Sequence, residues 1–507
     1  MVIPVISCRN DHIETDIARL KSVAVEEAAV TLTPGGSAQI HFRVKDPLFT
    51  IAGIKQLVIS PLTSARLLAV TSFAPDVVAG RYVAEIKDIG TGEYSVPVRL
   101  GIRLSPGSDA VVLSQEFTVT NAQKAPAGPD TGLPVVRINT EGAAPVNSKT
   151  EWVAASMYIG ESEYSCTVRG RGNSTWEWPK KPYLVRLDKK ASVLGLPAHK
   201  RWVLLANFMD RTLMRNIVSM KVSSLTSLAW TPSCESVELV LNGRHLGNYL
   251  LIEQVRVDPA RVDIDEEEGV LLELDFHEDE EIQWVDYHGR SDKRSTGIPF
   301  AIKYPDAGDI SPERVEQIKK YVSEAAGVLY GPGFDDPAGG YAKYLDVQSF
   351  IDYWIVFEVM GNHELGNPGS VFMHKDKGGK LTAGPCWDFD WGVLSYKTSP
   401  RARRGLINEE AIWYARLMAD PAFRSALKAR FLELLPSLEQ VPAFMEETEQ
   451  RLRRSAELNF SMWNPVQDAS LNNGDIINGD EYLSFHDACE RLRNNFRERL
   501  IVIRDCL

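Results

Sequence analysis

The N-terminal part of the chain alternates apolar and polar side chains in short runs, and this pattern restricts its fold more than any other feature. Examples are residues 38–44, 81–86 and 94–100, each with a period of two. Turn residues such as the Pro-Gly-Gly of 34–36 separate the runs. A period of two over about 100 residues with regular breaks is typical of a β-sandwich. We therefore predict an all-β, immunoglobulin-like sandwich over residues 18–122, which acts as a spacer or adhesion module.

The composition changes after this region. Residues 123–133 are dominated by turn and coil formers and predict a linker. The remaining segment, 134–507, begins with strand-like runs and continues with helical patterns. Strands followed by helices predict an α+β domain with two lobes.

Local signals mark several element boundaries in this second region. Asn242-Gly243 lies between two apolar runs, which is a strong hairpin signal. Ser311 followed by Pro312 predicts the start of a helix, and Asp346 predicts the start of another. Amphipathic stretches fill most of residues 408–507.

Charge and composition exclude several classes of protein. The chain has 507 residues with 56 Lys and Arg against 68 Asp and Glu, a net charge of −12. A net acidic surface repels phosphate backbones, so we expect no nucleic-acid partner. The sequence contains no run of about 18 apolar residues, so it predicts no membrane-spanning helix. The six cysteines form no CxxC pair, and His363-Glu364 lacks the second histidine of an HExxH zinc site.

A lipobox-like string lies near the N-terminus. Val5-Ile6-Ser7-Cys8 has the order apolar, apolar, small, cysteine, and polar residues follow it. Seven residues before Cys8 are too few for a full signal peptide, so a truncated start and a chance match both stay open as alternatives. We expect residues 1–17 to form a tether, and the protein to be extracytoplasmic, either lipid-anchored at the cell surface or periplasmic.

A basic, glycine-containing motif follows the linker. It consists of Arg-Gly-Arg-Gly-Asn-Ser-Thr-Trp at 169–176, with Lys180 and Lys181 shortly after. Glycines let backbone amides approach an anion closely, while guanidinium and ammonium groups bind phosphate oxygens. The motif is neither GxGxxG nor Walker A, so a tight hairpin with a solvated basic face is the alternative.

Two further motifs carry clustered polar residues. Residues 207–216 crowd polar groups at the start of an apolar stretch, which predicts a capping network. Asp388 and Asp390 lie two residues apart in a largely aromatic segment, so an extended chain places both on one side. A divalent cation would offset the cost of desolvating two carboxylates, and a buried structural pair is the alternative.

These motifs occur in the order found in a known family. The strings are RGRGNSTW with KKPY (169–183), KRWVLLAN (200–207), LVLNG with LGNYLLIEQ (239–254) and WDFD (387–390). The chain resembles the spore-coat-protein-H (CotH) kinase family over roughly residues 134–400, and the β-rich N-terminal region lies outside the match. The resemblance implies an atypical protein-kinase-like fold that uses ATP with Mg²⁺ or Mn²⁺ and phosphorylates serine or threonine of a protein acceptor.

Site residues follow from the same resemblance, position by position. Asp388 would bind the metal, with Asp390 as a second ligand or support, and Glu253 would be a structural or metal-side partner. The residues implied on the phosphate side are Arg171, Asn173, Lys180 and Lys181.

One catalytic position departs from the family pattern. The family's catalytic-loop aspartate lies about two dozen residues before the WDFD string, and the residue 24 positions before Asp388 is Glu364. A misplaced carboxylate can cost on the order of a hundredfold in rate. Three interpretations stay open: a kinase with a glutamate base, a transferase with another acceptor, and a nucleotide-binding pseudokinase.

Two alternatives lie outside phosphoryl transfer. A surface module could bind a protein or glycan ligand, an interpretation supported by the sandwich region and by tryptophans such as Trp176, Trp178 and Trp387. A metal-dependent hydrolase built on the acidic residues lacks an evident nucleophile.

Overall fold

A computed structural model describes residues 23–32, 36–44, 54, 56–61, 64–76, 79–90, 94–103, 111–121, 129–277, 280–288, 297–395, 397, 400–463 and 478–507. Cys8 and the predicted tether of residues 1–17 lie outside these ranges. The chain divides into two compact units: unit 1 comprises Met1–Asp130, Val135–Val168 and Glu238–Leu246, and unit 2 comprises Thr131–Pro134, Arg169–Val237 and Gly247–Leu507. The boundaries predicted at 122 and 134 stay predictions.

The N-terminal part of unit 1 is built from strands. They are β1 (Val23–Val25), β2 (Ala29–Thr31), β3 (Ser37–Val44), β4 (Gln56–Ser60), β5 (Leu68–Asp76), β6 (Arg81–Asp88), β7 (Tyr94–Arg103), β8 (Val112–Leu113) and β9 (Phe117–Asn121). One sheet has the order β1-β3-β6-β5 and the other β2-β9-β7-β4, with β8 paired to β7.

Alternation of side chains explains the core of this region. Ile40 and Phe42 on β3 are fully buried, as are Val98 and Leu100 on β7, and the side chains from both sheets form one hydrophobic cluster. The prediction of a strand-rich N-terminal region is confirmed. Its immunoglobulin-like topology stays a prediction.

Unit 1 also contains strands from later in the chain. They are β10 (Val135–Thr140), β11 (Val153–Ile159), most of β12 (Ser162–Gly170) and the second half of β15 (Cys234–Leu241). β10 pairs antiparallel with β11 and parallel with β15. Asn242 and Gly243 follow β15 with φ of 49° and 77°, as the central residues of a type I′ turn require. The predicted Asn-Gly turn is thus confirmed, and β16 (Arg244–Glu253) follows it.

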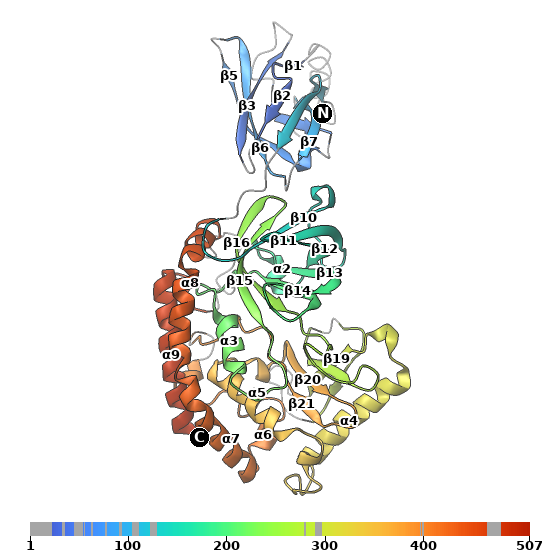
Figure 1. The fold of residues 1–507 in the computed structure, drawn as a ribbon, viewed down its shortest axis with the longest axis vertical. Coiled ribbons are helices and arrows are strands. Elements are labelled where there is room, and N and C mark those ends of the chain that lie inside the picture. The colour runs from blue at the N-terminus through green and yellow to red at the C-terminus, as the bar shows by residue number, and fades with distance from the viewer. Residues whose placement is uncertain are drawn as a thin grey trace, which may run out of the picture. The chain divides into compact units, whose positions relative to one another are not determined.

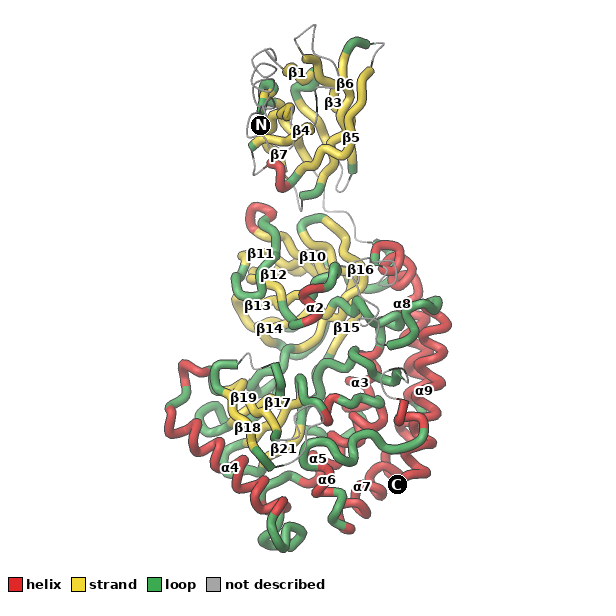
Figure 2. Tube along the Cα trace, turned by 180° about the vertical axis from the view of Figure 1, so that it is seen from behind, coloured by secondary structure: helices red, strands yellow, loops and turns green. Residues whose placement is uncertain are grey.

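Unit 2 contains two groups of strands. In the first, β14 (His199–Leu205) pairs antiparallel with both β13 (Tyr183–Ala191) and β16. The second is a five-stranded sheet with the order β18-β19-β17-β20-β21. Its strands, which lie as one layer beside helix α4 in Figure 2, are β17 (Val270–Leu274), β18 (Gln283–Asp286), β19 (Ile298–Tyr304), β20 (Val371–Lys375) and β21 (Leu381–Ala383).

Helices make up the rest of unit 2. They are α2 (Ser174–Glu177), α3 (Arg215–Ser223), α4 (Pro312–Tyr330), α5 (Val347–Val359), α6 (Tyr414–Leu417), α7 (Pro421–Leu438), α8 (Val441–Met462) and α9 (Phe485–Cys506). Ser311 Oγ accepts a hydrogen bond from Arg314 N at the start of α4. Asp346 Oδ1 accepts one from Ser349 N at the start of α5. Both predicted helix starts are therefore confirmed.

The C-terminal helices anchor the centre of unit 2. Helices α8 and α9 run side by side (Figure 1), and α9 also packs on α5. The fully buried Arg499 of α9 donates from Nε to the backbone oxygen of Glu358 at 2.8 Å, and its guanidinium also pairs with the Glu358 carboxylate. Among the residues that the structure describes, we find no helix with the length and apolar character needed to cross a membrane.

Candidate functional site

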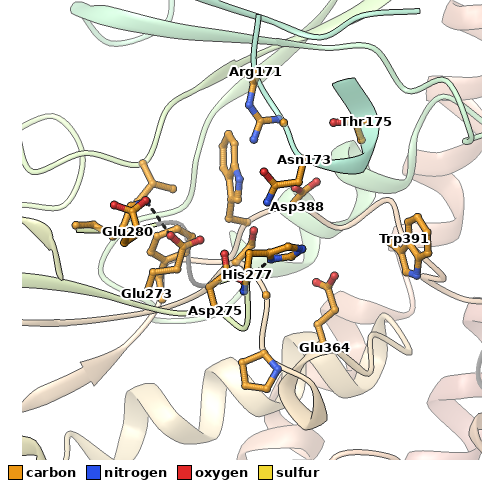
Figure 3. A pocket seen from close by; sticks show the side chains of 18 of the residues that line it. Arg171, Asn173, Thr175, Glu273, Asp275, His277, Glu280, Glu364, Asp388 and Trp391 are labelled. Carbon is orange, nitrogen blue, oxygen red and sulfur yellow. Dashed lines mark hydrogen bonds and ion pairs between the residues drawn. The ribbon is translucent and has the colours of Figure 1, made fainter. Parts of the chain in front are cut away.

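A large polar cavity lies within unit 2. Its volume is about 860 Å³, and all of its lining residues fall between Arg169 and Trp391. Arg171, Asn173, Asp388 and Glu364 all line it, and Figure 3 shows Arg171 and Glu364 at opposite ends of the view. Arg171 of the basic motif and Asp388 of the acidic motif are 217 positions apart along the chain, and the structure brings both to one cavity.

The basic motif forms a loop between β12 and the single-turn helix α2. A Cβ at Gly170 would lie 2.3 Å from the ring of Trp176, and one at Gly172 would lie 2.0 Å from Thr175 Oγ1. Gly172 also has φ of 86°, a left-handed conformation that favours glycine. The two glycines therefore make room for the loop's own side chains, which is a different reason from the close approach to an anion that the sequence suggested.

The acidic residues lie on one loop, residues 387–393, which we call the acidic loop. Phe389 is fully buried, while Asp388 and Asp390 on either side of it line the cavity. Both aspartates thus reach the cavity, although φ of Asp388 is 62°, so the segment is not the extended chain from which this was predicted. The Phe389 amide donates to Asn216 Oδ1 at 2.8 Å, and the Gly392 amide donates to Asn478 Oδ1 at 3.0 Å.

Burial and mutual repulsion disfavour the ionised forms of the carboxyl groups at this end of the cavity. Burial raises the pKa of Asp388, and the positive charge of Arg171 opposes this shift. Burial and then the charge of Asp388 raise the pKa of Asp390. Burial, followed by the charge of Asp388, raises the pKa of Glu364 well above its usual range. The three carboxyl groups are therefore close enough to disfavour each other's ionisation.

The chemistry of these donors fits a cation that arrives with a ligand. In the part of the chain that the structure describes, no group of three or more His, Cys, Asp or Glu side chains is arranged to hold a metal ion. Mg²⁺ is commonly bound by one or two carboxylates together with waters and substrate phosphates. Asn367, which also lines the cavity, has a buried Oδ1 without a hydrogen-bond partner. Asp388, Asp390 and Asn367 could thus supply oxygen ligands, with the remainder coming from phosphate and water.

Lys180 is not part of the cavity wall, contrary to its expected phosphate contact. Its side chain is buried, and Nζ donates to the oxygens of Ala206 and Asn459 at 2.7 and 2.8 Å and also to that of Asn248. The ammonium also lies 4.5 Å from the ring centre of Tyr249. These contacts give Lys180 a structural role, because its donors are already used inside the protein.

Lys181 is likewise not among the residues that line the cavity. Its Nζ donates to the backbone oxygen of Trp176 and lies 5.3 Å from the Trp176 ring centre. The structure therefore uses Lys181 to hold the end of α2.

Glu253 is also separated from the cavity. It is fully buried and accepts a hydrogen bond from Ser233 N at 2.8 Å, and the guanidinium of Arg261 lies 3.8 Å away. Its neighbour Gln254 does line the cavity. Because adjacent residues of an extended chain point in opposite directions, Glu253 faces the interior and has a structural role.

The polar motif at 207–216 forms a hydrogen-bonded network ahead of α3, although the N-cap residue of this helix is Met214, which makes no side-chain cap hydrogen bond. Asp210 accepts hydrogen bonds from Thr212 N and Arg215 N, both at 2.9 Å. The buried Arg215 guanidinium pairs with Asp210 and Asp480, and its Nε donates to Val393 O at 3.0 Å. This network therefore also supports the acidic loop.

Sequence reasoning missed a second charged group in the cavity. Lys303 Nζ lies 3.0 Å from the Glu273 carboxylate and also contacts Glu280. Burial raises the pKa of Glu273 to about 7, although Lys303 opposes the shift. A glutamate inside the apolar run of β17 was the available signal, since such residues are rarely buried without a partner.

The fold and the site define a mixed α+β protein whose second unit encloses a cavity with both acidic and basic walls. A sequence model described as CotH kinase protein matches residues 168–503. The chain belongs to the CotH kinase family, as the motifs predicted, and is a kinase-like protein.

Other comparisons add little to this assignment. No curated protein matches the chain. Among solved structures, a similarity is found to domains 1–6 of the surface layer protein SbsC, with 12% identity and a TM-score of 0.14 over 36% of this chain and 22% of that one. Another is found to BcpA, the major pilin subunit of Bacillus cereus, with 8% identity and a TM-score of 0.12 over 35% of this chain and 62% of that one. The chain thus spans less than two thirds of either protein.

Proposed function

We propose that this protein is an ATP-dependent phosphotransferase that transfers the γ-phosphoryl group to a serine or threonine hydroxyl of a protein acceptor. The observation that carries this proposal is the shared cavity, which Arg171 and Asn173 line together with Asp388 and Asp390. Membership of the CotH kinase family supports a two-lobed, kinase-like arrangement of the domain that follows the linker.

Each side of the cavity has a distinct role in this proposal. Asp388 and Asp390 would hold Mg²⁺ or Mn²⁺, and the bound cation would neutralise charge on the phosphates. Arg171 and Asn173 orient the phosphate oxygens, with the planar guanidinium well suited to contact two oxygens at once. Positioning and charge stabilisation of this kind supply most of the catalysis in phosphoryl transfer.

Glu364 is the candidate base. It would accept the hydroxyl proton of the acceptor as the new P–O bond forms and the bond to the nucleoside diphosphate breaks. Its raised pKa favours the protonated, inactive form in the free protein. Because the charge of Asp388 contributes to that shift, neutralising the Asp388 carboxylate lowers the pKa of Glu364, while burial, the larger cause, still raises it.

A catalytically weak pseudokinase is the second candidate. The glutamate in place of aspartate and its raised pKa both favour it. A glycan-binding module has less support, because Trp178 and Trp387 are almost fully buried, at 7% and 5% exposure. A glycan platform needs exposed rings.

Location forms a separate part of the proposal. We propose that the protein is extracytoplasmic and attached through a lipid on Cys8. The lipobox-like string 5–8 supports this assignment, and mass analysis of the protein from its native membrane tests it.

Calorimetric titration of Mn-ATP into Asp388→Asn and Glu364→Gln tests the function. We expect Asp388→Asn to weaken binding at least about tenfold, which corresponds to 1.4 kcal/mol. Glu364→Gln should retain binding and lose autophosphorylation. Asp505→Asn, which changes an exposed carboxylate on α9, is the control. Unchanged affinity in Asp388→Asn would contradict the assignment of the metal site. If the unmodified protein binds nucleotide but shows no phosphorylation, the pseudokinase interpretation is favoured.

A further inference from the structure

A buried charged network lies at the end of helix α5, and the site described above does not use it. It consists of Glu358, Asn408 and Arg499, each with 0% of its surface exposed. We call these three residues the α5 network, and none of them lines the cavity. Apolar residues of similar volume often serve stability as well as a buried ion pair does. The network therefore calls for a reason other than stability.

The Glu358 carboxylate accepts hydrogen bonds from two distant segments. Ile407 N donates to it at 2.7 Å and Asn408 N at 3.0 Å, and the Arg499 guanidinium of α9 pairs with it. The Asn408 side chain adds a further donor, because its Nδ2 lies 2.9 Å from Glu358 Oε2. The network therefore fixes residues 407 and 408 against the end of α5.

Asn408 connects this network to the loop that follows α5. Its Nδ2 also donates to Asn362 O at 2.9 Å, so both amide hydrogens of Asn408 are used. The side chain of Asn362 is buried, and its Oδ1 accepts a hydrogen bond from Glu364 N at 2.8 Å. Its Nδ2 lies 3.5 Å from Glu364 Oε2. Two successive amide side chains thus connect the network to Glu364, which lines the cavity (Figure 3).

The same end of α5 also holds the acidic loop. Leu394, directly after this loop, donates from its amide to Met360 O at 2.8 Å. Asn495 of α9 donates from Nδ2 to Leu394 O at 2.7 Å. Glu364 and the acidic loop are therefore both attached to the segment 358–362, and the position of this segment affects the spacing between their carboxylates.

We propose that Asn362 and Asn408 are positioning residues for Glu364, through which the α5 network sets the place of the Glu364 carboxylate relative to the acidic loop. The inference rests on the proposed phosphotransferase function, in which the acceptor hydroxyl lies between Glu364 and the γ-phosphoryl group. A displacement of about 1 Å caused by a change far from the chemistry can lower a rate about a hundredfold. The network therefore acts on the rate of transfer and not on nucleotide affinity.

Kinetics of Asn362→Ala and Asn408→Ala in the full chain test this inference. The rate of autophosphorylation is measured against the concentration of Mn-ATP. Each variant should lower the maximal rate at least about tenfold, because the base is no longer held in place. The KM for ATP should stay within about twofold, because Arg171 and Asn173 are unchanged. Asn494→Ala, on the exposed face of α9, is the control and should match the unmodified protein.

A conservative variant distinguishes positioning from a structural role. The hydroxyl of Asn362→Ser can accept from Glu364 N in the same kind of turn, although more weakly, so this variant should recover part of the maximal rate lost in Asn362→Ala. All variants are compared at a temperature at which circular dichroism shows them folded. The Asn362 variants provide the reading if Asn408→Ala fails to fold. Folded alanine variants with the maximal rate of the unmodified protein would overturn the inference.

Hydrogen exchange measured by mass spectrometry tests the same connection without turnover. The peptide that contains Glu364 should exchange faster in Asn408→Ala than in the unmodified protein, because Asn362 loses a partner. Equal exchange in the two proteins would overturn the inference, whatever the activity. Failure of the proposed function is a separate result: the unmodified protein would then transfer no phosphoryl group. An active unmodified protein with equally active variants would overturn the positioning role alone.

Discussion

His199, at the start of β14, is held in its neutral form inside unit 2. Its Nδ1 accepts a hydrogen bond from Arg201 N at 2.9 Å, so that nitrogen carries no proton. Burial lowers the pKa of His199 to about 4, the charge of Arg261 adds to the shift, and Asp258 opposes it. An unfolded histidine has a pKa of about 6.5. The unfolded chain therefore binds a proton between these values while the folded chain does not.

This difference makes stability depend on pH. The contribution of His199 is fully present above pH 6.5 and is lost as the pH falls toward 4. His199→Asn keeps an acceptor for Arg201 N and removes the titrating group, so its Tm should fall less between pH 7 and 4.5. Each kcal/mol of stability that the unmodified protein loses through His199 should appear as a Tm difference of about 2–4 °C between the two proteins. His288→Asn, at a partly exposed histidine, is the control, and identical pH profiles for His199→Asn and the unmodified protein would contradict the assignment.

At the scale of single residues, the sequence predicted correctly that Asp388 and Asp390 reach the site, but it was wrong for Lys180 and Lys181. Asp388 and Asp390 both line the cavity, as two carboxylates in one short motif indicated, although φ of 62° at Asp388 departs from the extended chain assumed for them. The partners of Lys180 lie 26, 68 and 279 positions away in the chain. No local pattern indicates whether a lysine's donors will be used by such distant oxygens, so its burial could not be predicted.

Among the elements, the acidic loop is held by groups from distant segments. Asn478 contacts this loop and is buried, with 3% of its surface exposed. Its Oδ1 accepts from Gly392 N, and its Nδ2 donates to Met209 O at 3.1 Å and Asp390 O at 3.3 Å. Together with Asn216, it fixes the backbone on both sides of Asp390.

Removing this clamp should loosen the carboxylates. Asn478→Ala leaves the Gly392 amide and the Met209 carbonyl without partners, which costs about 1–3 kcal/mol of unfolding free energy. We expect Mn-ATP affinity to fall about tenfold as the two aspartates lose their fixed spacing, a change of about 1.4 kcal/mol. Denaturant unfolding and calorimetry measure the two effects, and Asn494→Ala on the exposed face of α9 is the control. A loss of stability with no change in metal-nucleotide affinity would show that Asn478 does not position the loop.

Elements with strong local signals could be predicted from the sequence. Ser311 and Asp346 mark helix starts because their side chains satisfy backbone amides within three residues. The Asn242-Gly243 turn required only two residues that tolerate a positive φ. The pairing of Arg186 on β13 with Arg201 on β14 depends on strand register, which the surrounding sheet sets, and no pattern within either strand shows it.

For the whole molecule, all of the cavity comes from one unit. Its lining residues lie between Arg169 and Trp391, and unit 2 includes every one of them. The strand-rich region before residue 122 contributes none of these side chains. The sequence predicted that the site residues lie outside this region, because the region carries no cluster of charged or catalytic residue types.

Removal of residues 1–128 tests whether the site is self-contained. Distant, independent sites usually couple by only about 0.3–0.5 kcal/mol, so Mn-ATP affinity of the fragment 129–507 should stay within about twofold of the full chain. Circular dichroism first establishes that the fragment is folded, and calorimetry then measures the affinity. Asp388→Asn in the same fragment should lose binding as it does in the full chain. A folded fragment that no longer binds nucleotide would mean that the strand-rich region completes the site, because no residue lining the cavity has been removed.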